Sequence, residues 1–363
     1  MKNKVDLIIP VWNLLECTRD CIESIKRSTD YPYRLIVIDN GSDAETREYL
    51  SGLKESFDDM VLIRNSENLG FVKAVNQGIV LSDAPYRCIL NNDTIMTKGW
   101  LTELTGVMEA NPEIGLLNPS SNTSGQRAGR TPIDRYAESL AAEKGNIQEL
   151  YNARGFCMLV RRSVFEKLGP LDEIYHMGYF DDTDYCKRAQ KIGFRTARAK
   201  GAYVYHRENR SFALRKDNSD LFRKNEEIFF SRWGRHLRVG YFISTIENEA
   251  ARRKIDDLAT DVARSGHQIM IFVKKGLSWP VTCDHFDIRR QNVNGALFVF
   301  AGLYQILRRK KKKGMHILCS GNGFFGRILK IFSFLHGADV FIDPKKNNLL
   351  AMLEKRSREV TRG

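Results

Sequence analysis

The sequence contains no run of about twenty apolar residues, the length that a membrane-spanning helix requires. Its first residues, 1–4, lead directly into a strand pattern, without the hydrophobic stretch of a secretory signal. The seven cysteines are odd in number and form no Cys-x-x-Cys pair, so neither a zinc site nor a disulfide framework is indicated. These absences favour a protein of the reducing cytoplasm.

Acidic residues are in the minority, since 57 Lys and Arg accompany 44 Asp and Glu for a formal net charge of +13. This excess suits anionic partners such as nucleotide phosphates or anionic lipid headgroups. No zinc-finger spacing and no RNA-binding aromatic signature accompanies it, so we expect no nucleic-acid partner. With 363 residues, 42% of them hydrophobic, the chain can form two domains with packed cores.

The first part of the chain alternates strand and helix patterns. Helices are expected at 14–27, 45–53 and 72–79, and strands at 5–10, 35–38, 60–64 and 86–90. The run 35–38 has no polar residue, which is typical of a parallel strand covered on both faces. The alternation predicts an α/β fold with a mostly parallel, doubly wound sheet and right-handed crossovers.

Polar residues follow the carboxyl end of each expected strand. They are Trp12 and Asn13, Asp39 and Asn40, Asn68, and the run Asn91, Asn92 and Asp93. In a parallel sheet these ends share one edge, where open α/β sheets bind ligands. A plainer interpretation is that loops of any α/β protein are rich in Asn, Asp and Gly. That interpretation explains one loop well and four together less well, so we expect a nucleotide site.

Four ordered segments, 8–13, 37–42, 68–71 and 90–94, resemble the motifs of family 2 glycosyltransferases. The resemblance implies an inverting, metal-dependent sugar-nucleotide enzyme with a GT-A domain at 1–238. The donor would be a nucleoside-diphosphate sugar, with a UDP- or dTDP-linked sugar expected. The donor-site residues implied are Pro10, Val11, Asn13, Asp39, Asn40, Asn68, Gly70, Asn91, Asn92 and Asp93.

The resemblance also implies a divalent cation, Mn²⁺ or Mg²⁺, held by Asp93 and by His206 in the segment 204–206. Carboxylate oxygens suit such hard cations. The family's metal motif often begins with an acidic residue, whereas Asn91 and Asn92 stand here, so only Asp93 offers a carboxylate. A turn made of Asn-Asn-Asp is the plainer alternative for this motif.

The segment 180–186 resembles the family's acidic motif, which opens a helix and carries the catalytic base. An inverting sugar transfer needs a base that deprotonates the acceptor hydroxyl as it attacks. The resemblance places the base at Asp182 and leaves Asp181 to hold the acceptor or the local loop. The alternative is structural, because acidic residues in the first turn of a helix are favoured by its dipole. The segment 155–162 resembles the family's strand beside the acceptor.

Residues 239–363 are expected to form a second, Rossmann-like domain that resembles the first half of a GT-B glycosyltransferase. Strands are expected at 239–243, 269–273, 286–289, 316–319 and 339–342, and helices at 252–264, 296–307 and 324–335. Residues 321–326 fit the G-x-G-x-x-G pattern, with Asp343 beyond them. A dinucleotide-binding module is therefore an alternative, and glycines at a tight turn are the plainer account.

Six consecutive cations occupy 308–313, after an apolar helix pattern. They fit either peripheral contact with the inner face of a membrane or a solvated helix end. The resemblance implies an enzyme that moves a sugar onto a hydroxyl of a glycan or lipid-linked glycan, for cell-surface polysaccharide. The opposing hypothesis is a non-catalytic nucleotide- or glycan-binding protein.

Overall fold

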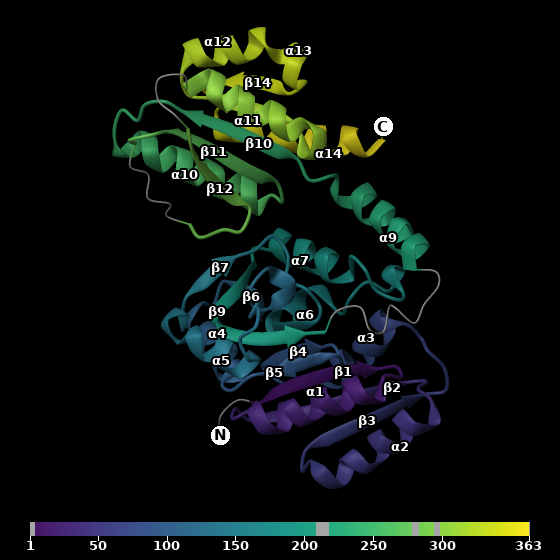
Figure 1. Cartoon of the computed structure of the whole chain (residues 1–363). Helices are drawn as coiled ribbons and strands as arrows, with labels where there is room; N and C mark the ends of the chain where they lie inside the picture. Colours follow the sequence, from purple (N-terminus) through teal and green to yellow (C-terminus); the bar gives the residue numbers. More distant parts are fainter. Residues whose placement is uncertain (1–3, 208–217, 278–282, 294–297, 363) are drawn as a thin grey trace. The chain divides into compact units, whose positions relative to one another are not determined.

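The computed structural model describes residues 4–207, 218–277, 283–293 and 298–362. It contains two compact units (Figure 1), one made of 1–148 with 152–227 and the other of 149–151 with 228–363. The boundary between the two units falls within one helix, α9 (Asn218–Trp233). The expected domain boundary at 238/239 therefore stays a prediction.

A mixed sheet forms the centre of the first unit, in the order β3-β2-β1-β4-β8-β6-β9-β5, with β7 beside β9. The four strands β3, β2, β1 and β4 run parallel, as expected, and β8 is antiparallel to β4 and β6. The strands are β1 (Val5–Val11), β2 (Tyr33–Asn40), β3 (Met60–Asn65), β4 (Tyr86–Leu90), β5 (Thr94–Met96), β6 (Ile114–Ser120), β7 (Ile147–Glu149), β8 (Cys157–Arg161) and β9 (Arg195–His206).

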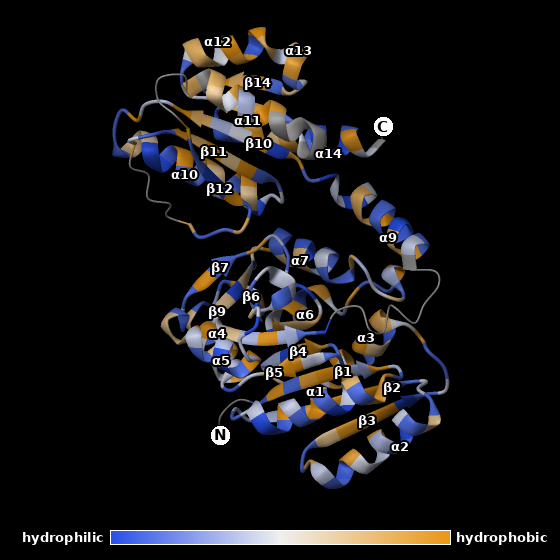
Figure 2. Cartoon of the chain, viewed as in Figure 1, coloured by the Kyte–Doolittle hydropathy of each residue, from blue (hydrophilic) through white to orange (hydrophobic). Residues whose placement is uncertain are grey.

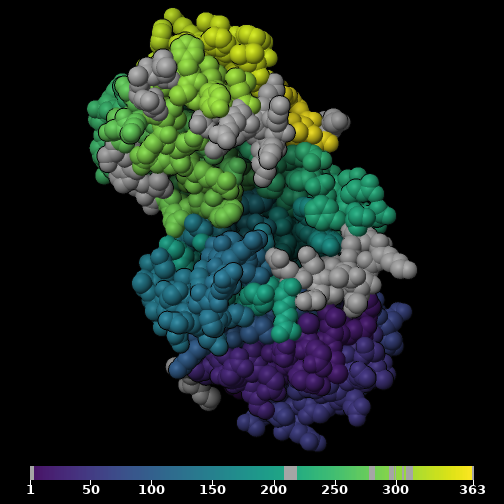
Figure 3. All heavy atoms as spheres, viewed as in Figure 1, coloured from purple at the N-terminus to yellow at the C-terminus, as the bar shows by residue number. Residues whose placement is uncertain are grey.

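Helices pack against this sheet through apolar stripes, of which α1 (Leu15–Ser28) is an example. In α1 the buried residues Cys21, Ile22 and Ile25 recur at helical spacing and join the core of the strands. Figure 2 shows hydrophobic residues along β1, β3 and β4, and Figure 3 shows the purple and blue segments packed as one body. The helices are α1 (Leu15–Ser28), α2 (Ala44–Gly52), α3 (Phe71–Leu81), α4 (Trp100–Ala110), α5 (Ile133–Ser139), α6 (Arg162–Leu168) and α7 (Asp181–Lys191).

The second unit is built on a parallel five-stranded sheet in the order β12-β11-β10-β13-β14. Two hydrophobic clusters, one on each face, hold the helices against it. The α/β fold class with a second α/β domain is thereby confirmed. The elements are β10 (Arg238–Ile243), α10 (Glu249–Arg264), β11 (Gln268–Lys274), β12 (Ile288–Val293), α11 (Phe298–Lys313), β13 (Ile317–Ser320), α12 (Gly323–Ile331), α13 (Ser333–His336), β14 (Asp339–Ile342) and α14 (Lys346–Arg362).

Two expected elements of this unit differ from the structure. The strand expected at 286–289 begins at Ile288, and the helix expected at 324–335 divides at Phe332 into α12 and α13. The cationic run 308–313 ends α11, and its side chains lie outside the described part of the structure. Nowhere in the described part of the chain does a helix combine the length and the apolar character needed to cross a bilayer.

The glycine-rich segment 321–326 joins β13 to α12. The Asn322 side chain accepts hydrogen bonds from the backbone N–H groups of Phe324 and Phe325, so it caps the helix. A Cβ on Gly326 would meet the Ile342 side chain at 2.4 Å, so this glycine permits close packing of α12 on β14. Capping and packing account for the asparagine and this glycine without a bound dinucleotide.

Candidate active site

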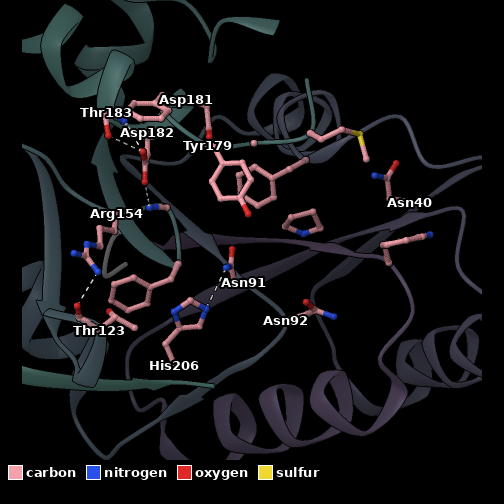
Figure 4. A pocket seen from close by; sticks show the side chains of 18 of the residues that line it. Asn40, Asn91, Asn92, Thr123, Arg154, Tyr179, Asp181, Asp182, Thr183 and His206 are labelled. Atoms are coloured by element: carbon pink, nitrogen blue, oxygen red, sulfur yellow. Dashed lines mark hydrogen bonds between the residues drawn. The ribbon is translucent and has the colours of Figure 1, made fainter. Parts of the chain in front are cut away.

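A cavity of about 540 Å³ opens at the carboxyl ends of the parallel strands in the first unit. Figure 4 shows its side chains converging from several elements. Nine of the expected site residues line it, namely Pro10, Val11, Asn40, Asn68, Asn91, Asn92, Asp181, Asp182 and His206. Four others are not part of this lining, and they are Asn13, Asp39, Gly70 and Asp93. The site assignments themselves stay predictions.

Asn40 and Asn68 fix the turn that leads into α3. The Asn40 amide donates to Oδ1 of Asn68 at 2.9 Å, and its own oxygen accepts from the Leu69 N–H at 3.1 Å. Asn68 Oδ1 also accepts from the Gly70 N–H at 2.9 Å. Because the two side chains hydrogen-bond to each other and to the backbone, they fix the turn at the cavity edge without a ligand.

Asn13 and Asp39 brace the next turn instead of facing the cavity. Asp39 is buried, and its Oδ1 accepts from the Ser42 N–H at 3.0 Å. Its Oδ2 lies 4.0 Å from Nε of Arg64. The Asn13 side chain accepts from the Asp43 N–H at 2.8 Å. Both residues therefore shape the loop after β2 through its backbone.

The loop before α7 carries unusual backbone geometry. His176, Tyr179 and Phe180 all have positive φ angles, of 42°, 68° and 67°. Such conformations are unfavourable for residues with a Cβ and persist only where surrounding structure holds them. Gly70 has φ +90° beside this loop, and a Cβ there would lie 2.7 Å from the His176 carbonyl oxygen. The glycine is thus required by the close approach of the two loops.

Asn225 on α9 holds this loop from behind. Its side-chain amide donates to the carbonyl oxygens of Tyr175 at 3.0 Å and Gly178 at 2.7 Å, and it is 1% exposed. Phe222, one helical turn earlier, packs its ring against Tyr179 and Phe180. The first half of α9 therefore positions the loop that leads into the acidic helix.

We expect Asn225→Ala to lower ligand affinity at the cavity and to reduce stability by about 1–3 kcal/mol, because buried carbonyls lose their donor. Thermal melts and isothermal titration with a nucleotide sugar measure the two effects. Asn111→Ala is the matched control, since its amide also donates to a carbonyl, that of Val107, at 2.8 Å, and it does not line the cavity. Equal affinities of the two variants would remove Asn225 from any positioning role.

Asp181 and Asp182 begin α7 and both line the cavity, yet their surroundings differ. Burial, and secondly the neighbouring Asp182 carboxylate, raise the pKa of Asp181 to about 8. Asp182 is half-buried and accepts from the Gly155 N–H at 2.8 Å, the Thr183 N–H at 2.6 Å and the Thr183 hydroxyl at 3.0 Å. Asp181 is therefore protonated at neutral pH, while donors on both oxygens hold Asp182 in one orientation.

This difference predicts a pH-dependent stability. Since the folded-state pKa of Asp181 is raised, its contribution to stability is present below the unfolded pKa, about 3.9, and is lost as pH rises towards 8. We expect the melting temperature of Asp181→Asn minus that of the wild type to increase between those limits and then to level off. A difference that stays constant over this range would show that Asp181 titrates normally.

Asp93 and His206 meet because β5 pairs antiparallel with the end of β9, which places Thr94 opposite His206. Asp93 Oδ1 lies 3.0 Å from His206 Nε2, and the Asn91 amide is 3.4 Å from that nitrogen. The other ring nitrogen of His206, Nδ1, is buried without a hydrogen bond within the described residues. An oxygen and a ring nitrogen so placed fit a divalent cation that takes its other ligands from a diphosphate.

The described residues contain no cluster of three or more His, Cys, Asp and Glu side chains able to hold a metal by themselves. Asp93 and His206 are only two ligands, because the neighbouring Asn91 and Asn92 carry no charge. Any cation here would depend on ligands supplied by the bound substrate. The fit is therefore to a metal–diphosphate complex.

Several cavity residues are absent from the sequence-based prediction. Arg154 places its positively charged guanidinium at the cavity wall, where it donates to the Thr123 carbonyl at 2.7 Å. Phe156 stacks on the His206 ring, with centroids 5.1 Å apart, and Tyr179 projects into the cavity (Figure 4). Arg154 and Phe156 flank Gly155 and Tyr179 precedes the acidic motif, so proximity to recognised motifs is the signal that could have found them.

Comparison with known proteins gives a match to the family described as Glycosyl transferase family 2 over residues 6–169. The glycosyltransferase AglE of Haloferax volcanii is 27% identical over 199 residues, which cover 52% of this chain and 62% of that protein. The O-antigen chain rhamnosyltransferase RfbN of Salmonella typhimurium is 26% identical over 218 residues, covering 57% and 67%. The chain thus spans less than two thirds of the Haloferax relative.

Among solved structures, the mannosyltransferase PcManGT of Pyrobaculum calidifontis, in complex with GDP-Man and Mn²⁺, matches with a TM-score of 0.45 and 16% identity. The match covers 64% of this chain and 63% of that one. The family match contains all four motif segments in full and begins within β1. It confirms the resemblance read from the sequence, and residues 6–169 of this chain belong to glycosyl transferase family 2.

Proposed function

We propose that this chain is an inverting glycosyltransferase that moves a sugar from a nucleoside-diphosphate sugar to a hydroxyl of a glycan or lipid-linked glycan. The observation that carries the proposal is the cavity in which the strand ends of a family 2 domain face the acidic start of α7. The named activities of the relatives, a glycosyltransferase and a rhamnosyltransferase of an O-antigen chain, support cell-surface polysaccharide as the product class.

The roles follow from position. Asn40, Asn68 and Pro10 form the strand-end side of the cavity, which suits the nucleoside of the donor. Asp182, fixed by three donors, is the general base for the acceptor hydroxyl. Asp181, protonated at neutral pH, can donate a hydrogen bond to the acceptor but cannot take its proton. The two carboxyl groups thus have environments that separate their tasks.

Asp93 and His206 would hold the divalent cation, Mn²⁺ or Mg²⁺, together with donor diphosphate oxygens. When bound, such a cation neutralises charge that develops on the leaving diphosphate. Arg154, at the same wall, adds a fixed positive charge that suits a phosphate. Asn91 contacts His206 and orients its ring.

A panel of UDP-, dTDP- and GDP-sugars, scanned by thermal shift, tests the donor, because a ligand of the folded state raises stability by RT ln(1 + [L]/Kd). Release of the nucleoside diphosphate from the stabilising donor then tests turnover. Stabilisation without release, with a full panel of glycan acceptors present, would assign the chain to the non-catalytic binding alternative. No stabilisation by any sugar nucleotide would overturn the proposal.

A further inference from the structure

A group of helices in the second unit exposes large apolar side chains. Phe300 and Tyr304 on α11 are 55% and 61% exposed, Phe324 and Ile331 on α12 are 68% and 67% exposed, and Phe334 on α13 is 75% exposed. We call these five residues the apolar patch. Isolated exposed apolar residues are common, but a concentration of this kind marks an interaction surface.

The patch is continuous across the three helices. Phe324 and Ile331 lie seven residues apart and therefore share one face of α12. The ring of Phe300 contacts that of Phe332, which in turn contacts Phe334, with centroids 6.4 Å apart in each pair. The three helices pack against one another, and Figure 2 shows hydrophobic positions along α12 and α13.

The charge of the same segment is one-sided. Residues 298–338, which contain the three helices, hold eight Lys and Arg and no Asp or Glu. Arg327 and Lys330 are exposed on α12, between Phe324 and Ile331. An apolar face on helices whose sequence carries basic but no acidic residues is the pattern of helices that lie in the interface of an anionic bilayer.

We infer that the apolar patch docks the second unit on an anionic membrane surface, with its side chains in the headgroup–acyl boundary. A second copy of the chain is a poorer partner, because a symmetric contact through this face would bring the cations of both copies together. The inference rests on the second unit alone and does not depend on transferase activity.

Sedimentation of the full chain with vesicles tests the inference. We expect binding to phosphatidylcholine vesicles that contain about one-third phosphatidylglycerol, and at least about tenfold weaker binding to phosphatidylcholine alone. The binding should weaken as salt is added, because salt screens exposed charges. Equal binding to both vesicle types, or to neither, would overturn the inference.

Two pairs of substitutions separate the apolar and cationic contributions. Arg327→Gln with Lys330→Gln should weaken binding about 25-fold, since each cation near such a surface contributes about fivefold. Ile331→Ser with Phe334→Ser should weaken it at least about tenfold. If the second pair lowers the melting temperature, the first pair, which changes only exposed charges, decides the question.

Matched controls lie elsewhere on the surface. Arg253→Gln with Lys355→Gln removes the same charge from side chains that are 75% and 79% exposed. Val80→Ser with Leu81→Ser removes exposed apolar groups from α3. Losses as large in these controls would overturn the inference. So would self-association that Phe334→Ser abolishes, or tighter binding to a single-stranded oligonucleotide than to the anionic vesicles.

Discussion

Asp182→Asn is expected to lower kcat by about 10²–10⁴-fold, roughly 3–5 kcal/mol of barrier, while donor affinity changes little. The amide keeps the size of the side chain but cannot take the proton of the acceptor hydroxyl. Asp182 reaches the cavity from the first turn of α7 and is oriented by Gly155 and Thr183, so the substitution removes basicity at a fixed position. Steady-state kinetics with donor and acceptor varied separately measure both quantities.

Asp181→Asn is the matched control for this experiment. An asparagine resembles the protonated acid that burial already imposes at Asp181, so we expect kcat to be retained and any change to fall on the acceptor KM. If Asp182→Asn turns over normally and Asp181→Asn is inactive, the base is Asp181. If both variants are fully active, the acidic motif serves only to begin the helix.

Removal of divalent cations is expected to abolish turnover, with recovery on addition of Mn²⁺ or Mg²⁺. The physical reason is that Asp93 Oδ1 and His206 Nε2, 3.0 Å apart, are placed to share a cation, and a diphosphate leaving group needs its charge neutralised. Asp93→Asn should weaken Mn²⁺ binding measured by titration calorimetry in the presence of a nucleoside diphosphate. Full activity in a chelator would make Asp93 a turn residue.

Asn91→Asp provides a gain-of-affinity control for the same site. The Asn91 side chain lies 3.4 Å from His206 Nε2, so a carboxylate there would add a charged ligand beside the same ring. We expect tighter Mn²⁺ binding than in the wild type, measured in the same titration. Unchanged affinity in both Asp93→Asn and Asn91→Asp would place any cation elsewhere.

The sequence alone determined the parallel pairing of the first four strands and the sheet edge at which their polar loops meet. Short apolar runs such as 35–38 are typical of buried strands, and helices between them favour parallel pairing. Parallel strands end on one edge, so Asn40, Asn68 and Asn91 had to converge there. The start of α7 also follows from sequence, because acidic residues occupy its first turn.

Tertiary structure alone decided the contacts between residues far apart in the chain. Asn225 reaches the Tyr175 carbonyl across 50 positions, and the Asp93–His206 pair depends on β5 pairing with the end of β9. Neither contact has a local pattern, because each is set by strand pairing and helix packing. The raised pKa of Asp181 has the same origin, since the burial that chiefly raises it comes from the packing of the fold around the start of α7.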